Sequence, residues 1–241
     1  MNNIVKQVLN PLLKNNKIFI PERFKKVKLD VGLSINAPNT EIWTENENNL
    51  LVIGFEPSSL CHDSFINNNR EMANKYPEYV FIKPDKIFDS FFPLKCALSN
   101  GQPRYQTFYN TGNDLGCSSL YEPVYFPIKQ IEEVPVITLE NFFDLFPWDQ
   151  ISYIDQLKID TQGSDYEVLL GAKNYINNII YITLENSTHG QYKKEEDYNK
   201  FDDYLKQFNF VKIKEEGINS TYLNYNYLDK SINVNFFIEN K

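Results

Sequence analysis

The segment DQLKIDTQGSDYEVLLGA, residues 155–172, decides the fold of this 241-residue chain. A short apolar run at residues 154–159 has the length of a buried strand, and Asp160 follows at its carboxyl end. Gly163 permits a tight turn, and the acidic Asp165 then suits the positive N-terminal end of a helix. The segment predicts a strand, a sharp turn and a helix, which is the repeating unit of a parallel sheet covered by helices.

The same alternation extends over most of the chain. Strand-length apolar runs occupy residues 27–31, 51–55, 94–98, 154–159 and 179–184. Segments with a helical period lie at residues 58–70, 139–146, 166–175 and 196–208. Alternating strands and helices predict an α/β fold with a mostly parallel sheet and helices on both faces.

Two stretches depart from this alternation. Residues 101–127 lose the helical period and are rich in turn residues, which predicts an inserted hairpin after the third strand. Residues 210–214 and 233–238 are strand-like runs on either side of a polar segment, and we expect them to form a closing hairpin. The predicted sheet then has seven strands, in a domain at residues 26–241 that follows a basic amphipathic segment at residues 1–25.

Charge is unevenly distributed along the chain. The 24 Lys and Arg residues against 32 Asp and Glu residues give a formal net charge of −8. Residues 1–28 hold seven cations and one anion, and therefore +6, which leaves −14 for the rest. We expect no nucleic-acid partner, because binding to a phosphate backbone needs clustered cations.

The basic N-terminal segment has two interpretations. We favour packing of its apolar residues on the domain, with the lysines in solvent, because Pro11 interrupts the helical stripe. Peripheral contact with a membrane surface or an acidic partner is the alternative. We expect neither a cleaved signal peptide nor a transmembrane segment, since no apolar stretch fits either one.

Cysteine usage indicates the compartment. Cys61, Cys96 and Cys117 are an odd number at unrelated spacings, with two histidines in the whole chain and no C-x-x-C pair. We therefore predict no zinc site. A reduced, cytoplasmic protein is the simplest expectation.

The first predicted strand ends in DVGLSINAPN, residues 30–39. Ligands of doubly wound folds bind at the carboxyl ends of the strands, where a glycine lets them approach the backbone. Asp30 and Gly32 are placed for such a contact, and we expect Asn36 to take the positive-φ turn usually given to glycine. The dinucleotide pattern G-x-G-x-x-G does not occur, because Ser34 stands where the second glycine is needed.

The second predicted strand ends in GFEP, residues 54–57. An acidic residue at this strand tip accepts hydrogen bonds from the ribose hydroxyls of an adenosine ligand, and Glu56 fits that role. A charge-assisted bond of this kind is worth about 1.5–3 kcal/mol. Pro57 then ends the strand, and Ser58 is expected to cap the next helix.

Five short motifs follow one another along the chain. They are DVG at residues 30–32, FEP at 55–57, ALS at 97–99, VPVITLE at 134–140 and KIDTQGSDYEVLLGA at 158–172. In this order they resemble the FkbM-type methyltransferase family, over residues 28–185. The resemblance implies a Rossmann-like class I fold and an S-adenosylmethionine-dependent methyltransferase. It further implies O-methylation of a hydroxyl on a sugar, a glycan or a small metabolite.

The resemblance also implies the cofactor site by position. The residues implied to bind S-adenosylmethionine are Asp30, Gly32, Ser34, Asn36, Glu56, Pro57, Ala97, Leu98, Ser99 and Asp160. Among them, Glu56 would hold the ribose, and Asp160 would face the methyl group and the acceptor.

A hydroxyl acceptor needs a base. Asp160 is the first candidate, because we expect its position at a strand tip in a partly dry cleft to raise its pKa towards neutrality. His189 is the second, since the free pKa of histidine lies near physiological pH. The alternatives are an Asp160 that only orients the following turn and a His189 that is merely solvated.

Acceptor binding is assigned to Glu185, Tyr109 and Tyr121. The two tyrosines would stack on a sugar face, although packing alone also favours aromatic residues in strands. A divalent cation shared by Asp160 and Glu185 would polarise the acceptor, but no spacing motif supports a metal.

Two other functions compete with methyl transfer. The first is a non-catalytic binding or scaffold protein on a degenerate methyltransferase fold, because Ser34 and Asn36 depart from the glycine-rich first loop of the family. The second is an NAD-binding oxidoreductase, which shares the acidic residue on the ribose but requires the glycine pattern for the pyrophosphate.

Overall fold

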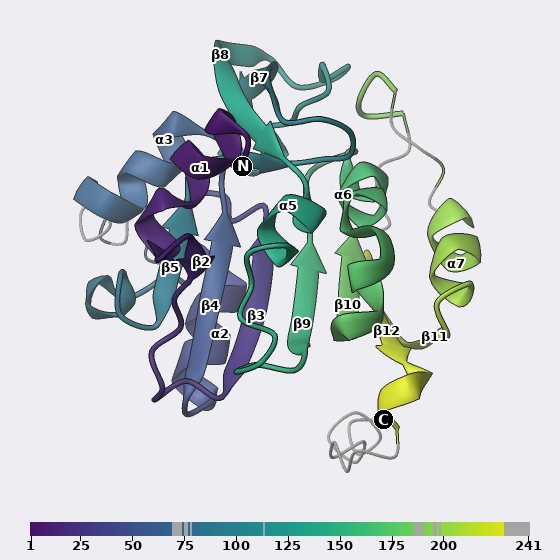
Figure 1. Ribbon diagram of the computed structural model, residues 1–241. Coiled ribbons are helices and arrows are strands. Elements are labelled where there is room, and N and C mark those ends of the chain that lie inside the picture. The colour runs from purple at the N-terminus through teal and green to yellow at the C-terminus, as the bar shows by residue number, and fades with distance from the viewer. Residues whose placement is uncertain are drawn as a thin grey trace.

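The computed structural model describes residues 1–68, 74, 77, 79–112, 114–185, 190–194, 197 and 199–228. Within these residues, seven strands form a central sheet in the order β11-β12-β10-β9-β3-β4-β5. Figure 1 shows helices on both faces of this sheet, with α1 and α5 in front and α2 behind. The expected α/β class is therefore confirmed.

The central sheet is mixed. Its parallel neighbours are β10 (Ile179–Glu185), β9 (Ile154–Ile159), β3 (Lys26–Val31), β4 (Leu50–Phe55) and β5 (Phe91–Leu94). At the other edge, β12 (Asn219–Asn224) runs antiparallel to both β10 and β11 (Phe210–Glu216). After β3 the chain continues outward through β4 and β5 and then returns to the other side of β3 with β9. The switch point of the sheet therefore lies between β3 and β9.

Two apolar layers hold the sheet. The larger core lies on the face covered by α1 (Asn3–Leu9), α5 (Leu139–Phe143), α6 (Asp165–Ala172) and α7 (Asn199–Lys206). The smaller core lies under α2 (Pro38–Asn46), where Trp43 packs near Val52 and Phe91. Every residue of β4 is buried, as expected for a strand with neighbours on both sides and helices on both faces.

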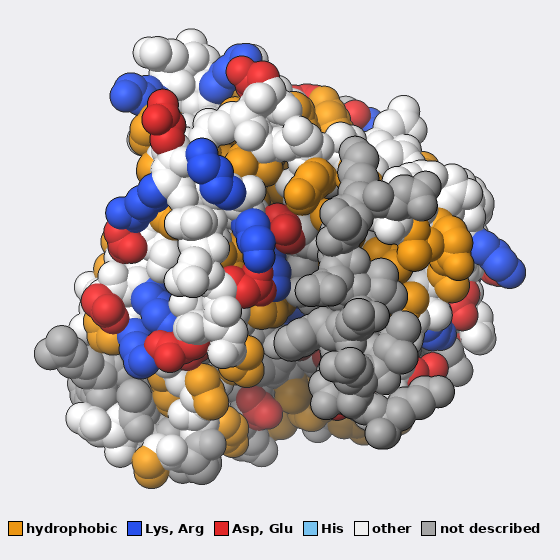
Figure 2. All heavy atoms as spheres, turned by 90° about the horizontal axis from the view of Figure 1, so that it is seen from below, with side chains coloured by type: hydrophobic (Ala, Val, Ile, Leu, Met, Phe, Trp, Pro, Cys, Tyr) orange, Lys and Arg blue, Asp and Glu red, His pale blue; other side chains and the backbone are white. Residues whose placement is uncertain are grey.

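The N-terminal segment packs on the larger core. Val5, Leu9 and Leu12 are buried there, and a short hairpin of β1 (Leu13–Lys14) and β2 (Lys17–Ile18) follows. This packing agrees with the interpretation favoured from the sequence. Figure 2 shows Lys and Arg side chains interspersed with Asp and Glu side chains over the face seen from below.

A second sheet stands over the carboxyl ends of the central strands (Figure 1). It contains β6 (Ala97–Leu98), β8 (Ile128–Ile137) and β7 (Arg104–Thr111), with β7 and β8 antiparallel. The prediction of one strand at residues 94–98 is wrong, because a tight turn, in which Cys96 N donates to Leu94 O at 3.0 Å, redirects the chain between β5 and β6. The insertion also extends past its predicted boundary at residue 127, since the partner of β7 is β8.

The closing hairpin differs from its prediction as well. Its first strand is β11, as expected, but its second strand is β12, which follows after a turn through Gly217 at a φ of 58°. The glycine allows a two-residue turn between Glu216 and Asn219, so the strand that pairs with β11 starts at residue 219 and not at residue 233. The predicted strand at residues 233–238 lies outside the described residues.

The helix predictions were right in kind. Those over residues 139–146 and 196–208 extend past the ends of α5 and α7, and the last two residues of the one over 58–70 lie outside the described residues. The segment predicted from residue 58 forms α3 (Ser59–Asp63) and then a π-helical turn at Ser64–Asn68. Ser58 caps α3 by accepting a hydrogen bond from Cys61 N, which confirms its predicted role. After α6 the chain tightens into a 3₁₀ helix at Lys173–Asn178, and shorter 3₁₀ turns occupy Asn10–Leu12, Pro84–Lys86, Leu115–Cys117 and Tyr225–Tyr227.

Candidate active site

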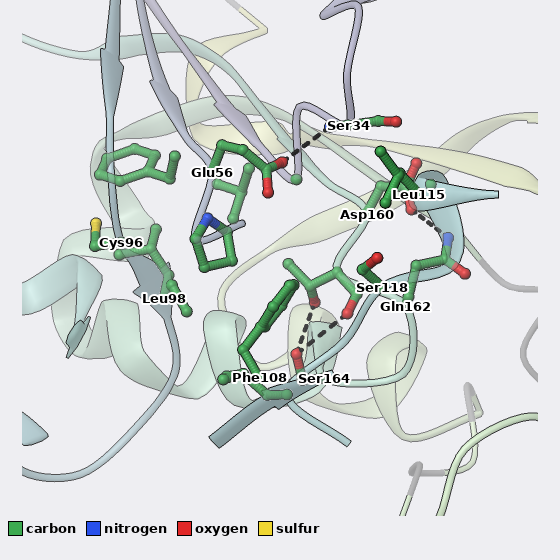
Figure 3. A pocket seen from close by; sticks show the side chains of 18 residues that line it. Ser34, Glu56, Cys96, Leu98, Phe108, Leu115, Ser118, Asp160, Gln162 and Ser164 are labelled. Atoms are coloured by element: carbon green, nitrogen blue, oxygen red, sulfur yellow. Dashed lines mark hydrogen bonds between the residues drawn. The ribbon is translucent and has the colours of Figure 1, made fainter. Parts of the chain in front are cut away.

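A cleft opens at the carboxyl ends of β3, β4 and β9, where the strand order reverses. Its empty volume is about 620 Å³, part of which is open to solvent. Figure 3 shows Glu56 towards one side of the cleft and Asp160 and Gln162 towards the other. The remaining wall is largely apolar and includes Cys96, Leu98, Phe108, Leu115 and Leu120.

Glu56 is buried at the tip of β4 and ties two loops together. One carboxylate oxygen, Oε2, accepts hydrogen bonds from the backbone N–H groups of Leu33 (3.1 Å) and Ser34 (3.0 Å). The other, Oε1, accepts one from Ser58 N at 2.9 Å. Burial nevertheless raises the pKa of Glu56 to about 8. Since Oε1 accepts one bond of about two that it can take, the carboxylate keeps capacity for a ligand hydroxyl.

Gly32 is required by its contact with β9. A Cβ atom built there would lie 1.8 Å from the carbonyl oxygen of Asp160, and the residue has a φ of 81°. The sequence explained this glycine by the approach of a ligand, whereas the structure explains it by the approach of the neighbouring strand end. Gly32 still lines the cleft beside Ser34.

The first loop uses different positive-φ residues from the one predicted. Ser34 (φ 54°) and Ala37 (φ 45°) take this conformation, and Asn36 does not. Asn36 instead donates a hydrogen bond from Nδ2 to the carbonyl of Val80 at 2.9 Å. The expectation for Asn36 is therefore wrong, because its side chain is held by a loop outside the cleft.

Lys158 connects the ends of β3 and β9 beneath the cleft. Its buried ammonium lies 3.1 Å from Asp160 Oδ2 and 3.9 Å from Asp30 Oδ1, and it donates to the carbonyl of Gly32 at 3.2 Å. Asp30 accepts a bond from Thr40 Oγ1 (2.7 Å), and its Oδ1 receives no hydrogen bond from the described residues. Burial raises the pKa of Asp30, so Lys158 compensates its charge incompletely.

Asp160 is a weaker base than expected. Burial alone would raise its pKa, but the nearby Lys158 ammonium and hydrogen bonds to its carboxylate lower the pKa below the ordinary value. The predicted shift towards neutrality is therefore wrong in sign, because the sequence pattern did not place Lys158 beside Asp160. Asp160 lines the cleft as an ionised group.

Gln162 joins Asp160 to Glu185. Its amide Nε2 donates to Asp160 Oδ1 at 2.7 Å and to Glu185 Oε2 at 2.8 Å. Its Oε1 accepts a hydrogen bond from the hydroxyl of Tyr192 at 2.9 Å. Because carboxylates can only accept, this arrangement fixes which end of the amide faces them.

The turn after β9 is fixed by Asp165 at the start of α6. Its carboxylate accepts hydrogen bonds from Thr161 N (3.1 Å) and Gly163 N (3.3 Å), and burial raises its pKa to about 6. Asp165 therefore closes this turn, and Thr161 and Gln162 of the turn line the cleft.

The second sheet covers the cleft. Phe108 from β7 and Leu120 lie on its apolar wall, and the 3₁₀ turn Leu115–Cys117 lies over the opening. Ser119 Oγ donates to the carbonyl of Gln162 at 2.7 Å, and the hydroxyl of Tyr192 lies 2.9 Å from the carbonyl of Cys117. These bonds hold the insertion against the turn that follows β9.

The structure brings seven of the predicted cofactor residues into the cleft wall. They are Gly32, Ser34, Glu56, Pro57, Ala97, Leu98 and Asp160. Asp30 and Ser99 are buried behind the wall, and the remaining predicted residues Asn36, Glu185, Tyr109 and Tyr121 do not line it in the part of the chain that the structure describes. His189 lies outside the described residues, so its predicted role as a base stays a prediction.

Sequence reasoning missed several residues of the site. They are Lys158, Thr161, Gln162, Ser164, Leu115, Ser118 and Tyr192. Lys158 and Gln162 stand within the KIDTQG motif, two residues on either side of Asp160, so their positions were available as a signal. Tyr192 becomes relevant only when the fold brings it to Gln162.

Neither a metal centre nor a membrane helix emerges from the described residues. No group of three or more His, Cys, Asp and Glu side chains among them is arranged to hold a metal ion. None of the helices formed by these residues is long and apolar enough to cross a membrane.

Comparison with known proteins gave one family and one solved structure of interest. The sequence model of the Methyltransferase FkbM domain family matches residues 30–212. A search of curated proteins gave no match. A crystal structure described as methyltransferase FkbM from Methylobacillus flagellatus KT is similar, with 14% identity and a TM-score of 0.43. The match covers 83% of this chain and 44% of that chain, so this chain spans less than half of that protein's length.

Proposed function

The chain belongs to the FkbM methyltransferase family, and on this premise we propose that it transfers a methyl group from S-adenosylmethionine to a hydroxyl oxygen. The acceptor is a sugar, a glycan or a small metabolite. The observation that carries the proposal is the cleft at the switch point, with a buried carboxylate from β4 on one side and Asp160 from β9 on the other. This position favours a Rossmann-like class I fold with its ligand at the strand ends.

The residues of the cleft fit an adenosine ligand. Glu56 retains capacity to accept hydrogen bonds from ribose hydroxyls, and Leu98 and Phe108 offer an apolar wall for the adenine. Asp160 and Thr161 supply a polar end for the methionine group. S-adenosylmethionine would supply a methyl group that is already activated by its sulfonium.

With an activated methyl group, the protein's own task is mainly to position the acceptor and exclude water. The 3₁₀ turn at Leu115–Cys117 lies over the cleft, and a Cβ atom at Gly116 would be 3.5 Å from Ser34 Oγ, so the insertion closely covers the first loop. Asp160 is ionised and orients the acceptor hydroxyl through a hydrogen bond. Glu185, His189, Tyr109 and Tyr121 remain proposed contributors to acceptor binding and proton removal.

We place the protein in the cytoplasm. All three cysteines are free thiols, which supports a reducing compartment. The proposed partners are a small-molecule or glycan acceptor and no nucleic acid. A peripheral contact would use the basic side chains of the N-terminal segment, whose apolar face is already packed.

Calorimetric titration with S-adenosylhomocysteine, the demethylated product, tests the proposal. We expect binding by the wild-type chain and its loss in Glu56→Ala, because the ribose loses its acceptor. Glu140→Gln is a matched control, since Glu140 on α5 pairs with Lys173 and does not line the cleft. No binding at millimolar ligand would refute the proposed function.

A non-catalytic binding protein on this fold is the second candidate. The observation that favours it is that three backbone N–H groups donate hydrogen bonds to Glu56 and so use much of the hydrogen-bonding capacity of its carboxylate. A folded wild-type chain that binds no S-adenosylhomocysteine would favour this candidate.

A further inference from the structure

Acidic side chains gather at the carboxyl ends of the central strands, in and behind the wall of the cleft. Glu56 and Asp160 line the cleft after β4 and β9, whereas Asp30 near the end of β3, Asp165 at the start of α6 and Glu185 at the end of β10 lie behind them. Lys158 forms ion pairs with two of these groups, Asp30 and Asp160. A buried carboxylate is costly unless a positive charge or several hydrogen bonds compensate it.

The carboxyl groups of this end differ in charge. Burial raises the pKa values of Asp30, Glu56 and Asp165, which favours their neutral forms. The nearby Lys158 ammonium and hydrogen bonds lower the pKa of Asp160 despite its burial, so Asp160 stays ionised and lines the cleft. A ligand that brings a positive charge beside Asp160 is attracted to it.

Gln162 brings two of these carboxyl groups together. Its amide nitrogen Nε2 donates hydrogen bonds to Asp160 Oδ1 at 2.7 Å and to Glu185 Oε2 at 2.8 Å, so both carboxyl groups lie next to the same nitrogen atom. Gln162 also has a φ of 56°, a conformation that side chains other than glycine and asparagine rarely adopt. Three contacts keep it there: the two carboxyl groups and the hydroxyl of Tyr192.

We infer that Asp160 and Glu185, joined by Gln162, form an acidic dyad that recognises the positive charge of the ligand, so that the cleft prefers a cationic sulfonium to a neutral thioether. The inference rests on the proposed function. It makes Asp160 and Glu185 specificity-determining residues and Gln162 and Tyr192 positioning residues. In the transfer the sulfur–methyl bond would break as the methyl–oxygen bond forms, the neutral thioether would leave, and the hydroxyl proton would pass to a carboxylate of the dyad, which would stabilise the positive charge first at sulfur and then at oxygen. A neutral acceptor therefore suits the site, and an anionic one is disfavoured.

Two ligands isolate the effect. S-adenosylmethionine and S-adenosylhomocysteine differ by one methyl group and one positive charge at sulfur, so the ratio of their dissociation constants reports the recognition of that charge. We expect the full-length wild-type chain to bind S-adenosylmethionine about tenfold more tightly, since a unit charge within a few ångströms of a partly dry carboxylate readily gives this factor.

Glu185→Gln is the decisive variant. It keeps the size of the side chain and an oxygen for Gln162 Nε2, and it should bring the two dissociation constants within about twofold by weakening S-adenosylmethionine alone. Asp160→Asn should act in the same direction, but it also removes the charged partner of buried Lys158. If Asp160→Asn unfolds, the result for Glu185→Gln alone tests the inference. Tyr192→Phe should lower the ratio partially. Glu216→Gln, at an exposed position on β11, is the control for net charge and should leave the ratio unchanged.

The outcomes separate the inference from the proposed function. If both ligands bind but the ratio is unaltered in a folded Glu185→Gln variant, or both ligands weaken equally, the inference is overturned and the proposed function stands. If neither ligand binds to the wild-type chain, the proposed function and the inference fail together.

Discussion

Replacing Gly32 with alanine tests how closely the first loop must approach the end of β9. The new Cβ atom would lie 1.8 Å from the Asp160 carbonyl oxygen, whereas such contacts are essentially never below 3.0 Å in real structures. The two strand ends would have to separate by about 1.2 Å, and this overpacking costs about 1–3 kcal/mol or more. The left-handed φ adds about 1–2 kcal/mol. We expect a loss of about 2–5 kcal/mol of unfolding free energy, a large part of the stability of a typical domain.

Equilibrium unfolding in urea, followed by circular dichroism, measures this loss. Gly217→Ala is the matched control, because Gly217 also has a positive φ, of 58°, but has nothing within 4 Å of its built Cβ. It should lose about 1–2 kcal/mol from backbone strain alone. If Gly32→Ala loses no more than Gly217→Ala, the close approach of the loop to Asp160 is wrong.

Three further predictions concern the charges and the apolar wall of the cleft. Lys158→Met should lower the unfolding free energy in urea by about 3–5 kcal/mol, because it leaves Asp30 and Asp160 without their buried cation; a loss below about 1 kcal/mol would show that this ion pairing is unimportant. The affinity for S-adenosylhomocysteine should rise between pH 6.5 and pH 8.5 and then level off. Burial raises the pKa of Glu56 to about 8, so its carboxyl group is protonated at lower pH, whereas ribose binding favours the ionised form. An affinity that falls over this range, measured by calorimetry, would contradict the assignment of Glu56. Phe108→Ala should weaken binding of the same ligand about tenfold, because it removes part of the apolar wall of the cleft. Tyr109→Ala, at the next residue of β7, should leave the affinity within twofold of the wild type. Equal effects of the two variants would argue against adenine binding at this wall.

The sequence predicted the central strands well and the insertion poorly, for a physical reason. Strand β4 is an apolar run that is buried throughout, and β3, β9 and β10 are largely buried, so their apolar residues mark them in the sequence. The second strand of the insertion, β8, reads as exposed and charged over its first half, and its partner lies across a long loop. Pairing over such a distance leaves no local periodicity to detect.

The site shows the same division. Glu56 and Asp160 could be placed from the sequence because each follows directly after a buried strand. The sign of the Asp160 pKa shift could not, because it depends on the rotation of Lys158 towards the same side of β9, two residues earlier. The contact of Tyr192 with Gln162 joins residues 30 positions apart and exists only in the folded chain.

The most direct test of methyl transfer in this cleft is a crystal structure of the chain soaked with S-adenosylhomocysteine. The account predicts ligand density in the cleft between β3, β4 and β9, with the ribose hydroxyls on Glu56, the adenine against Leu98 and Phe108, and the sulfur near Asp160. An empty cleft at millimolar ligand, or a ligand bound elsewhere on the chain, would contradict it.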